Sequence, residues 1–224
     1  KIDRSVLQKA FLEQADESFT PEDRINWRIN GEASSLNKQL WYYYAIQNIN
    51  GIDVENAITG ITVKNGVEAK LHKSTFIKDL ASKVNSASPS LQAMQAVEKA
   101  ITHLKLEAKE PLKQLETRNS GKEIVFNKAG ISQEDIKASL VYLPINNGEE
   151  VKLVWNVNMF MLSGDHWWNV RIDAQTGEHL GDFDWTVSCT FEDKDHASHG
   201  HGNTKGLKNN TFKNVVKDVC AEQD

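Results

Sequence analysis

The sequence predicts an α+β fold with two units, each combining a helix with an antiparallel sheet, followed by a flexible C-terminal tail. Apolar residues recur at helical spacing in one segment of each half. Each half also contains strand-like runs joined by Asn-Gly turns. The last part of the chain is polar, with several Gly and His and few apolar residues. We therefore expect domains at residues 1–110 and 111–188 and a tail at 189–224.

The first predicted element is a helix close to the N-terminus. Either Asp3 or Ser5 can cap it, because both side chains can accept a hydrogen bond from a backbone N–H group of the first turn. The apolar positions that follow helical spacing are Val6, Leu7, Ala10 and Phe11. A polar connector, a short strand at 27–29 and a loop at 31–38 should follow.

An antiparallel meander is expected next. Its three strand-like runs span residues 40–46, 52–63 and 67–76, and the first is rich in the aromatic residues that strands prefer. Asn50-Gly51 and Asn65-Gly66 separate the runs. A type I′ hairpin turn needs positive φ at both central residues, which Asn and Gly tolerate, so both pairs predict hairpins.

A second helix should begin near Pro89, with Ser88 or Ser90 as its N-cap. Its apolar positions step by three and four residues and form one stripe, made of Leu91, Met94, Val97, Ile101 and Leu104. The charged stretch that follows, residues 107–120, contains Pro111 and indicates an irregular connection.

A second meander completes the predicted sheet. Its strands are expected at residues 123–126, 136–143, 151–161, 166–172 and 178–187. Pro144 should end the second of these, and Asn147-Gly148 should turn the chain. Apolar side chains alternate with polar ones along 151–161, so one face of that strand should be buried and the other wet. The two halves thus share an architecture, which we interpret as an architectural repeat.

Composition and motifs exclude several classes of protein. The chain has 26 Lys and Arg against 31 Asp and Glu, a net charge of −5, so nucleic acid is not an expected partner. No run approaches the roughly 18 apolar residues that a membrane span needs. The HExxH, GxSxG, Walker and GxGxxG motifs are absent from the sequence, so we expect a non-catalytic protein.

The ends of the chain bear on its cellular compartment. It begins at Lys1 without a signal peptide, which indicates a processed product. Its two cysteines, Cys189 and Cys220, both lie in the predicted tail. They could form one disulfide bond in an oxidising compartment, or they could remain two unpaired thiols.

Several segments resemble a known family of propeptides. Residues 151–180, VKLVWNVNMFMLSGDHWWNVRIDAQTGEHL, resemble the PepSY domain in propeptides of fungalysin-type secreted metallopeptidases. Three earlier segments are similar to the fungalysin/thermolysin propeptide motif of the same proteins. They are 49–57 (INGIDVENA), 61–66 (ITVKNG) and 88–100 (SPSLQAMQAVEKA). The resemblance covers about residues 1–190.

This resemblance implies a role and a location. Such propeptides assist the folding of the attached zinc peptidase and keep it latent until they are cleaved off, and they are not enzymes. The PepSY part is cystatin-like, with a curved antiparallel sheet and a helix. The implied partner is a fungalysin-like zinc peptidase domain, joined in cis or held in a non-covalent complex. We expect zinc in that partner, no cofactor in this chain, and a secreted, extracellular or periplasmic protein.

Two other functions remain open. The chain could be a free-standing secreted PepSY-type module that regulates proteases without being fused to one. It could also be a metal-binding protein built around the His-containing tail. The tail carries a cluster of ligand-type residues, namely Asp193, Asp195, His196, His199 and His201. These residues could be a solvated polar run, or one of them could fill the open position of the partner's zinc.

Tryptophans supply the other candidate residues for partner binding. Strand alternation places Trp155 and Trp168 toward the core and Trp167 on the opposite face, where it could contact a partner. Asn169 and Arg171 share the Trp167 face and could form the rim of such a contact. The histidines that are scattered through the rest of the sequence are expected to be surface or half-buried residues rather than ligands: His72, His103, His166 and His179.

Overall fold

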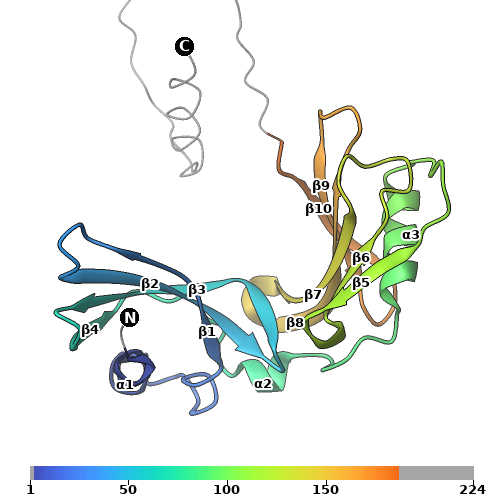
Figure 1. Cartoon of the computed structure of the whole chain (residues 1–224). Coiled ribbons are helices and arrows are strands. Elements are labelled where there is room, and N and C mark those ends of the chain that lie inside the picture. Colours follow the sequence, from blue (N-terminus) through green and yellow to red (C-terminus); the bar gives the residue numbers. More distant parts are fainter. Residues whose placement is uncertain (1–2, 187–224) are drawn as a thin grey trace, which may run out of the picture. The chain divides into compact units, whose positions relative to one another are not determined.

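The computed structural model describes residues 3–186, so the predicted tail lies outside the described residues. The fold is α+β with a mostly antiparallel sheet, as predicted (Figure 1). Its longer helices are α1 (Arg4–Gln14) and α3 (Ala93–His103), and a short helix α2 (Leu80–Lys83) lies between them. The strands are β1 (Trp27–Ser34), β2 (Leu40–Ile49), β3 (Ile52–Lys64), β4 (Glu68–Leu71), β5 (Gln114–Arg118), β6 (Glu123–Phe126), β7 (Ile136–Ile145), β8 (Glu150–Phe160), β9 (Trp167–Asp173) and β10 (His179–Asp184).

Helix α1 confirms the first predicted element. The Asp3 carboxylate accepts a hydrogen bond from the Ser5 N–H at 3.0 Å, so Asp3 is the N-cap. Leu7 and Phe11 are buried on one side of the helix, which packs against β4. The Phe11 ring stacks on that of Trp27, with centroids 4.4 Å apart, and this contact ties the helix to the start of β1.

Strands β2 to β4 form the predicted antiparallel meander, and both Asn-Gly pairs adopt positive φ. Strand β1 pairs antiparallel with β2 and extends this meander. Two boundaries were predicted wrongly. β1 continues to Ser34, through part of the expected loop at 31–38, because a bulge after Ile29 keeps the strand paired with β2. β4 covers only Glu68–Leu71 of the expected run at 67–76.

Helix α3 begins later than predicted, at Ala93 rather than near Pro89. The N–H groups of Ser90 and Leu91 both donate to the Ala174 carbonyl, at 3.0 and 2.8 Å, and this pairing holds the preceding segment outside the helix. Its fully buried face consists of small residues, Ala93, Ala96, Val97 and Ala100, whereas most of the larger predicted stripe is half-buried. Small residues on this face let α3 lie close to the sheet.

Three further corrections concern α2, β5 and Pro144. Helix α2 was not predicted. Its first N–H groups donate to the buried Asp23 carboxylate from far along the chain. β5 forms inside the stretch expected to be irregular, and all five of its residues are exposed. Pro144 does not end β7 but pairs with Val151 inside it.

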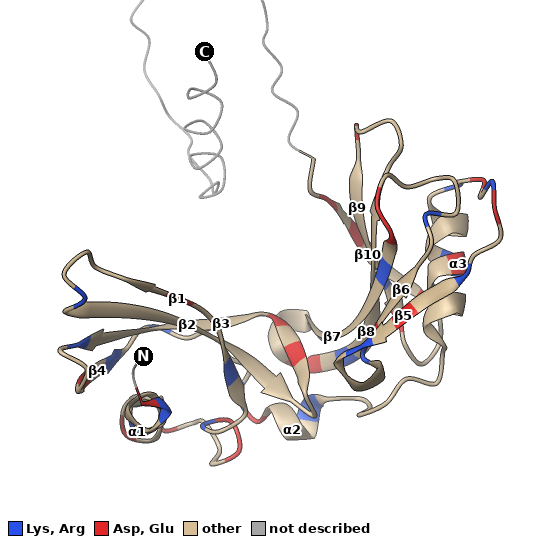
Figure 2. Cartoon of the chain, in the orientation of Figure 1, with Lys and Arg blue, Asp and Glu red and all other residues tan. Residues whose placement is uncertain are grey.

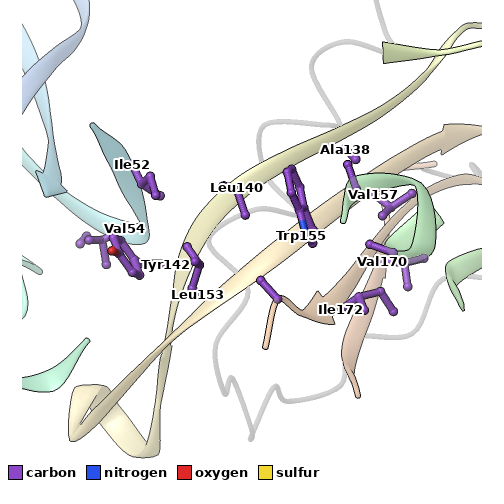
Figure 3. Close-up of a cluster of buried hydrophobic side chains, with 14 of the residues drawn as sticks. Ile52, Val54, Ala138, Leu140, Tyr142, Leu153, Trp155, Val157, Val170 and Ile172 are labelled. Carbon is purple, nitrogen blue, oxygen red and sulfur yellow. The ribbon is translucent and has the colours of Figure 1, made fainter. Parts of the chain in front are cut away.

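One sheet runs through both halves of the described chain. The order of its strands is β1-β2-β3-β7-β8-β9-β10, and β3 and β7 meet in parallel at Val54 and Tyr142. Buried apolar side chains continue across this junction, from Ile52 and Val54 to Leu153 and Trp155 (Figure 3). The proposed division into domains at 1–110 and 111–188 stays a prediction. No helix among residues 3–186 is long and apolar enough to cross a membrane.

Candidate partner-binding surface

The two neighbouring tryptophans of β9 point to opposite faces of the sheet, as predicted. Trp155, opposite Ile172 on β9, is buried and donates its indole N–H to the Leu91 carbonyl at 2.8 Å, so this face of the sheet points toward α3. Trp168 lies on the same face, is half-buried and stacks on His166 with centroids 4.9 Å apart. Trp167 therefore lies on the face that points away from α3, which we call the open face.

Trp167 is exposed but held in place. It is 41% exposed, and its indole N–H donates to Asn158 Oδ1 at 2.7 Å. Its ring also lies against that of Phe160, its partner on β8, with centroids 5.6 Å apart. A large apolar side chain with a fixed orientation loses little conformational entropy when a partner covers it.

Two more exposed aromatic side chains lie beside Trp167 on the open face. Phe183 on β10 is 49% exposed, and Trp185 just after β10 is 54% exposed. Their rings meet in a T-shaped contact with centroids 4.9 Å apart, and the Trp185 N–H donates to the Trp167 carbonyl. We call Phe160, Trp167, Phe183 and Trp185 the aromatic edge, because β10 is the last strand in the order of the sheet.

Asp184 holds the backbone around the aromatic edge. Its Oδ1 atom accepts hydrogen bonds from the N–H groups of Trp167 and Thr186, at 3.0 and 2.9 Å. Its Oδ2 atom lies 2.6 Å from His166 Nδ1. One carboxylate therefore joins the start of β9 to the end of β10 and fixes the positions of both exposed tryptophans.

The same contacts shift the pKa values of Asp184 and His166. Burial acts to raise the pKa of Asp184, but the hydrogen bonds from His166, Thr186 and Trp167 outweigh it and lower this pKa to about 2. The hydrogen bond to Asp184 raises the pKa of His166 above its usual 6.5. The carboxylate and the imidazolium ion thus stabilise each other beside the aromatic edge.

Asn169 and Arg171 share the open face with Trp167, but both are engaged within the chain. Asn169 lies between Asn158 on β8 and Phe183 on β10, and it is only 7% exposed, too buried for a rim residue. Its Oδ1 atom has no hydrogen-bond partner among the described residues. Arg171 forms a bidentate ion pair with Glu55 of β3, in which each side chain is 20% exposed.

Trp167 was expected from the sequence to be a contact residue, whereas Phe183 and Phe160 were not. The alternation of Phe183, Asp184 and Trp185 would have placed both aromatic rings on one face of an exposed strand. The tail residues Asp193, Asp195, His196, His199 and His201 lie outside the described residues, and so do Cys189 and Cys220. Their predicted roles stay predictions.

Other exposed surfaces are present in the described part of the chain. Tyr42, Tyr44 and Ile58 are exposed on β2 and β3. A shallow groove of about 540 Å³ lies at the end of α3 and is lined by residues that include Leu104, Met161 and Trp168. Lys, Arg, Asp and Glu are interspersed along the described strands (Figure 2). The aromatic edge differs from these surfaces because it combines fixed aromatic rings with a terminal strand.

Comparison with known proteins finds similarity to an extracellular metalloproteinase. No protein-family model matches the chain. A curated relative is "Extracellular metalloproteinase 9" of Coccidioides posadasii, 27% identical over 155 residues, which are 65% of this chain and 23% of that protein. The chain thus spans less than a quarter of the relative's length. Among solved structures, the Bacillus megaterium YpeB C-terminal domain is similar over 84% of this chain and 68% of that chain, with a TM-score of 0.33 and 11% identity.

Proposed function

We propose that this chain is the propeptide of a secreted, fungalysin-like zinc metallopeptidase, and that it acts as an intramolecular chaperone and inhibitor until it is cleaved off. The observation that carries the proposal is the similarity to an extracellular metalloproteinase, which spans 65% of this chain but only 23% of that protein. An accessory segment of a peptidase would match in this way. The propeptide-like segments at 49–57, 61–66, 88–100 and 151–180 support the same role.

In this role the aromatic edge contacts the peptidase. Aromatic side chains are enriched at interfaces because they bury a large area with few rotatable bonds. Trp167 is already fixed by Asn158 and Phe160, so little order has to be gained on binding. The outer edge of β10 offers backbone groups to an extended segment of the partner.

The proposal gives the peptidase the zinc ion and gives this chain no catalytic role. The tail, tethered to a bound sheet, would reach the active-site cleft at an effective concentration on the order of millimolar. His196, His199 or His201, or one of the nearby aspartates, could then occupy the open zinc position. The location of the protein would be extracellular, as for the metalloproteinase to which it is similar.

The test uses the purified full chain and a fungalysin-type zinc peptidase, with peptide hydrolysis as the readout. We expect the chain to inhibit the peptidase and W167A and W185A each to weaken inhibition by roughly 10–100-fold, as interface aromatic residues do when they are truncated. Y44A is the matched control, because Tyr44 and Trp185 are both 54% exposed. The Y44A variant should inhibit as well as the parent chain.

Sequencing the gene beyond the codon for Asp224 distinguishes a propeptide that is fused to a peptidase from a free-standing inhibitor module. A reading frame that continues into an HExxH-containing domain supports the propeptide. A frame that stops, together with inhibition in trans, indicates a free-standing secreted inhibitor module instead. A chain that neither binds nor inhibits the peptidase would refute both.

A further inference from the structure

Two histidines and an aspartate meet where the end of α3 faces β10. His103 is the last residue of α3, and His179 and Asp182 belong to β10. The His103 Nε2 atom lies 2.9 Å from Asp182 Oδ2, and the His179 Nε2 atom lies 3.4 Å from the same oxygen. The two imidazole rings stack with centroids 3.5 Å apart. One ligand-type atom from each residue lies within 4.8 Å of the other two.

A β-bulge brings two of these residues to one face. Residues 179 and 182 would point to opposite faces of a regular strand, because side chains alternate. Here His179 pairs with Ile172 and Asp182 with Val170, so β10 carries one extra residue between them. Ile172 and Val170 both point toward α3, and the bulge therefore turns His179 and Asp182 toward α3 as well. Bulges commonly re-aim side chains in this way beside functional sites.

The His179 imidazole also lacks a hydrogen bond at Nε2, the ring atom that lies near Asp182. Its Nε2 atom is buried and has no hydrogen-bond partner among the described residues, although Asp182 lies within ion-pair distance. A buried polar atom without a hydrogen bond is uncommon in folded proteins and often marks the position of an ion or a water molecule. The Nε2 atom of His179 is thus available to bind a cation when the ring carries its proton on Nδ1.

We propose that His103, His179 and Asp182 bind a Zn²⁺ ion through the two Nε2 atoms and one carboxylate oxygen. Zinc takes His and Asp ligands at about 2.0–2.2 Å, which places neighbouring ligand atoms of a tetrahedral site about 3.4 Å apart. The separations of 2.9 and 3.4 Å are close to this value. The two stacked imidazole rings would have to turn so that both Nε2 lone pairs point at the ion. His103 and Asp182 are exposed, which gives the ion a path and leaves the fourth position to water.

The bound ion would join the C-terminal end of α3 to the terminal strand of the sheet. That strand also carries Phe183 of the aromatic edge, on its opposite face. Zinc binding at His103, His179 and Asp182 does not depend on the proposed function. A chain that inhibits no peptidase could still bind zinc here.

The test titrates ZnCl₂ into the full chain carrying H196A, H199A and H201A, so that the tail imidazoles do not contribute. Calorimetry should show one bound ion per chain. In NMR spectra of the imidazole groups, the signals of His103 and His179 should shift and those of His72 should not. The melting temperature should rise with ZnCl₂, because the ion binds the native state.

Single substitutions on this background assign the ligands. H179Q and D182N should each weaken zinc binding at least about tenfold, since even residues behind the ligands are worth 10–100-fold. H72Q is the matched control, because His72 is an exposed histidine whose Nε2 lies 2.6 Å from Thr62 Oγ1, and the H72Q variant should bind Zn²⁺ as the background protein does. Circular dichroism without metal checks that each variant is folded.

Two results would overturn the proposal. One is an H103Q/H179Q double variant that binds Zn²⁺ as tightly as the background protein. The other is a background protein whose His103 and His179 signals do not respond to a molar excess of ZnCl₂, and this measurement needs no substitution within the site.

Discussion

Asp184 joins the two strands that carry most of the aromatic edge. It accepts hydrogen bonds from two backbone N–H groups and from His166, and each bond holds a different part of the edge. Neither exposed tryptophan is fixed by apolar packing alone. The geometry of the proposed binding surface is therefore sensitive to the charge on one half-buried carboxylate.

The first prediction concerns pH. The pKa of His166 is raised, so its stabilising contribution is complete below about pH 6.5 and is lost as the pH rises through its folded-state value. The pKa of Asp184 is lowered from 3.8 to about 2, so its contribution is present above pH 3.8 and is lost as the pH falls toward 2. The edge should be held most firmly between these limits, from about pH 4 to 6.5.

NMR titration of the His166 ring checks this prediction. Its midpoint should lie above 6.5 in the parent chain and should fall in D184N. D165N is the matched control, because Asp165 raises the pKa of His166 through charge alone and by less than Asp184 does. A D165N shift as large as that of D184N would show that the hydrogen bond is not the main cause.

At the scale of elements, local patterns predicted those elements whose cap, turn or alternation lies within their own residues. Helix α1, the Asn-Gly hairpins and the alternating strand β8 are of this kind. Helix α2 depends on Asp23 from far along the chain, and the start of α3 depends on Ala174. A sequence pattern does not contain such partners. β5 was missed because both its faces are exposed, so it lacks alternation.

The candidate sites show the same difference between features that a local pattern predicts and features that depend on distant residues. Alternation within β9 was enough to place Trp167 on the open face and Trp168 toward the core. The meeting of His103 with His179 depends on the packing of α3 against β10 and on a bulge that no periodic pattern reveals. From the sequence these histidines were expected to be surface or half-buried residues rather than ligands, and the structure brings His103 and His179 together.

The second prediction tests the β-bulge of β10. Gly181 has a φ of 136°, a conformation that residues with a Cβ atom rarely adopt, although a Cβ atom there would meet nothing closer than 3.9 Å. G181A should therefore cost about 1–3 kcal/mol of unfolding free energy through backbone strain alone. Urea unfolding of the G181A variant and the parent chain measures this loss of unfolding free energy.

G31A is the control for G181A. Gly31 also follows a bulge, but it lacks positive φ and has comparable space, so the change should be close to neutral. An equal loss of stability in both variants would show that the strain at Gly181 is not the cause.

At the scale of the whole described chain, the first four strands share a buried core with the rest of the sheet, and specific contacts at two places add to it. One is the parallel pairing of Val54 with Tyr142, and Tyr142 also accepts a hydrogen bond from Asn50. The other is the ion pair of Glu55 with Arg171. Arg171 was predicted from sequence to be a rim residue for a partner, and its guanidinium group instead binds β3.

The third prediction measures this ion pair by a double-mutant cycle. E55Q and R171Q, singly and together, should give a coupling energy of about 1–3 kcal/mol in urea unfolding, because the pair is bidentate and mostly buried. The Glu116–Arg118 pair is far more exposed, and the same cycle there should give a clearly smaller coupling energy, because water screens the two charges. Equal coupling energies would show that the Glu55 pair adds nothing beyond a surface contact.

The junction between β3 and β7 also has a consequence for biosynthesis. Asn50 and Tyr142 are 92 residues apart, so the ribosome releases β1 to β4 well before β7 exists. The hairpins of that meander are local and can form during translation, whereas the junction must wait for a distant segment. Until then the strand edge around Val54 is unpaired and open to pairing with other chains. We expect the nascent chain to be most prone to aggregation, and to need chaperones most, during this interval.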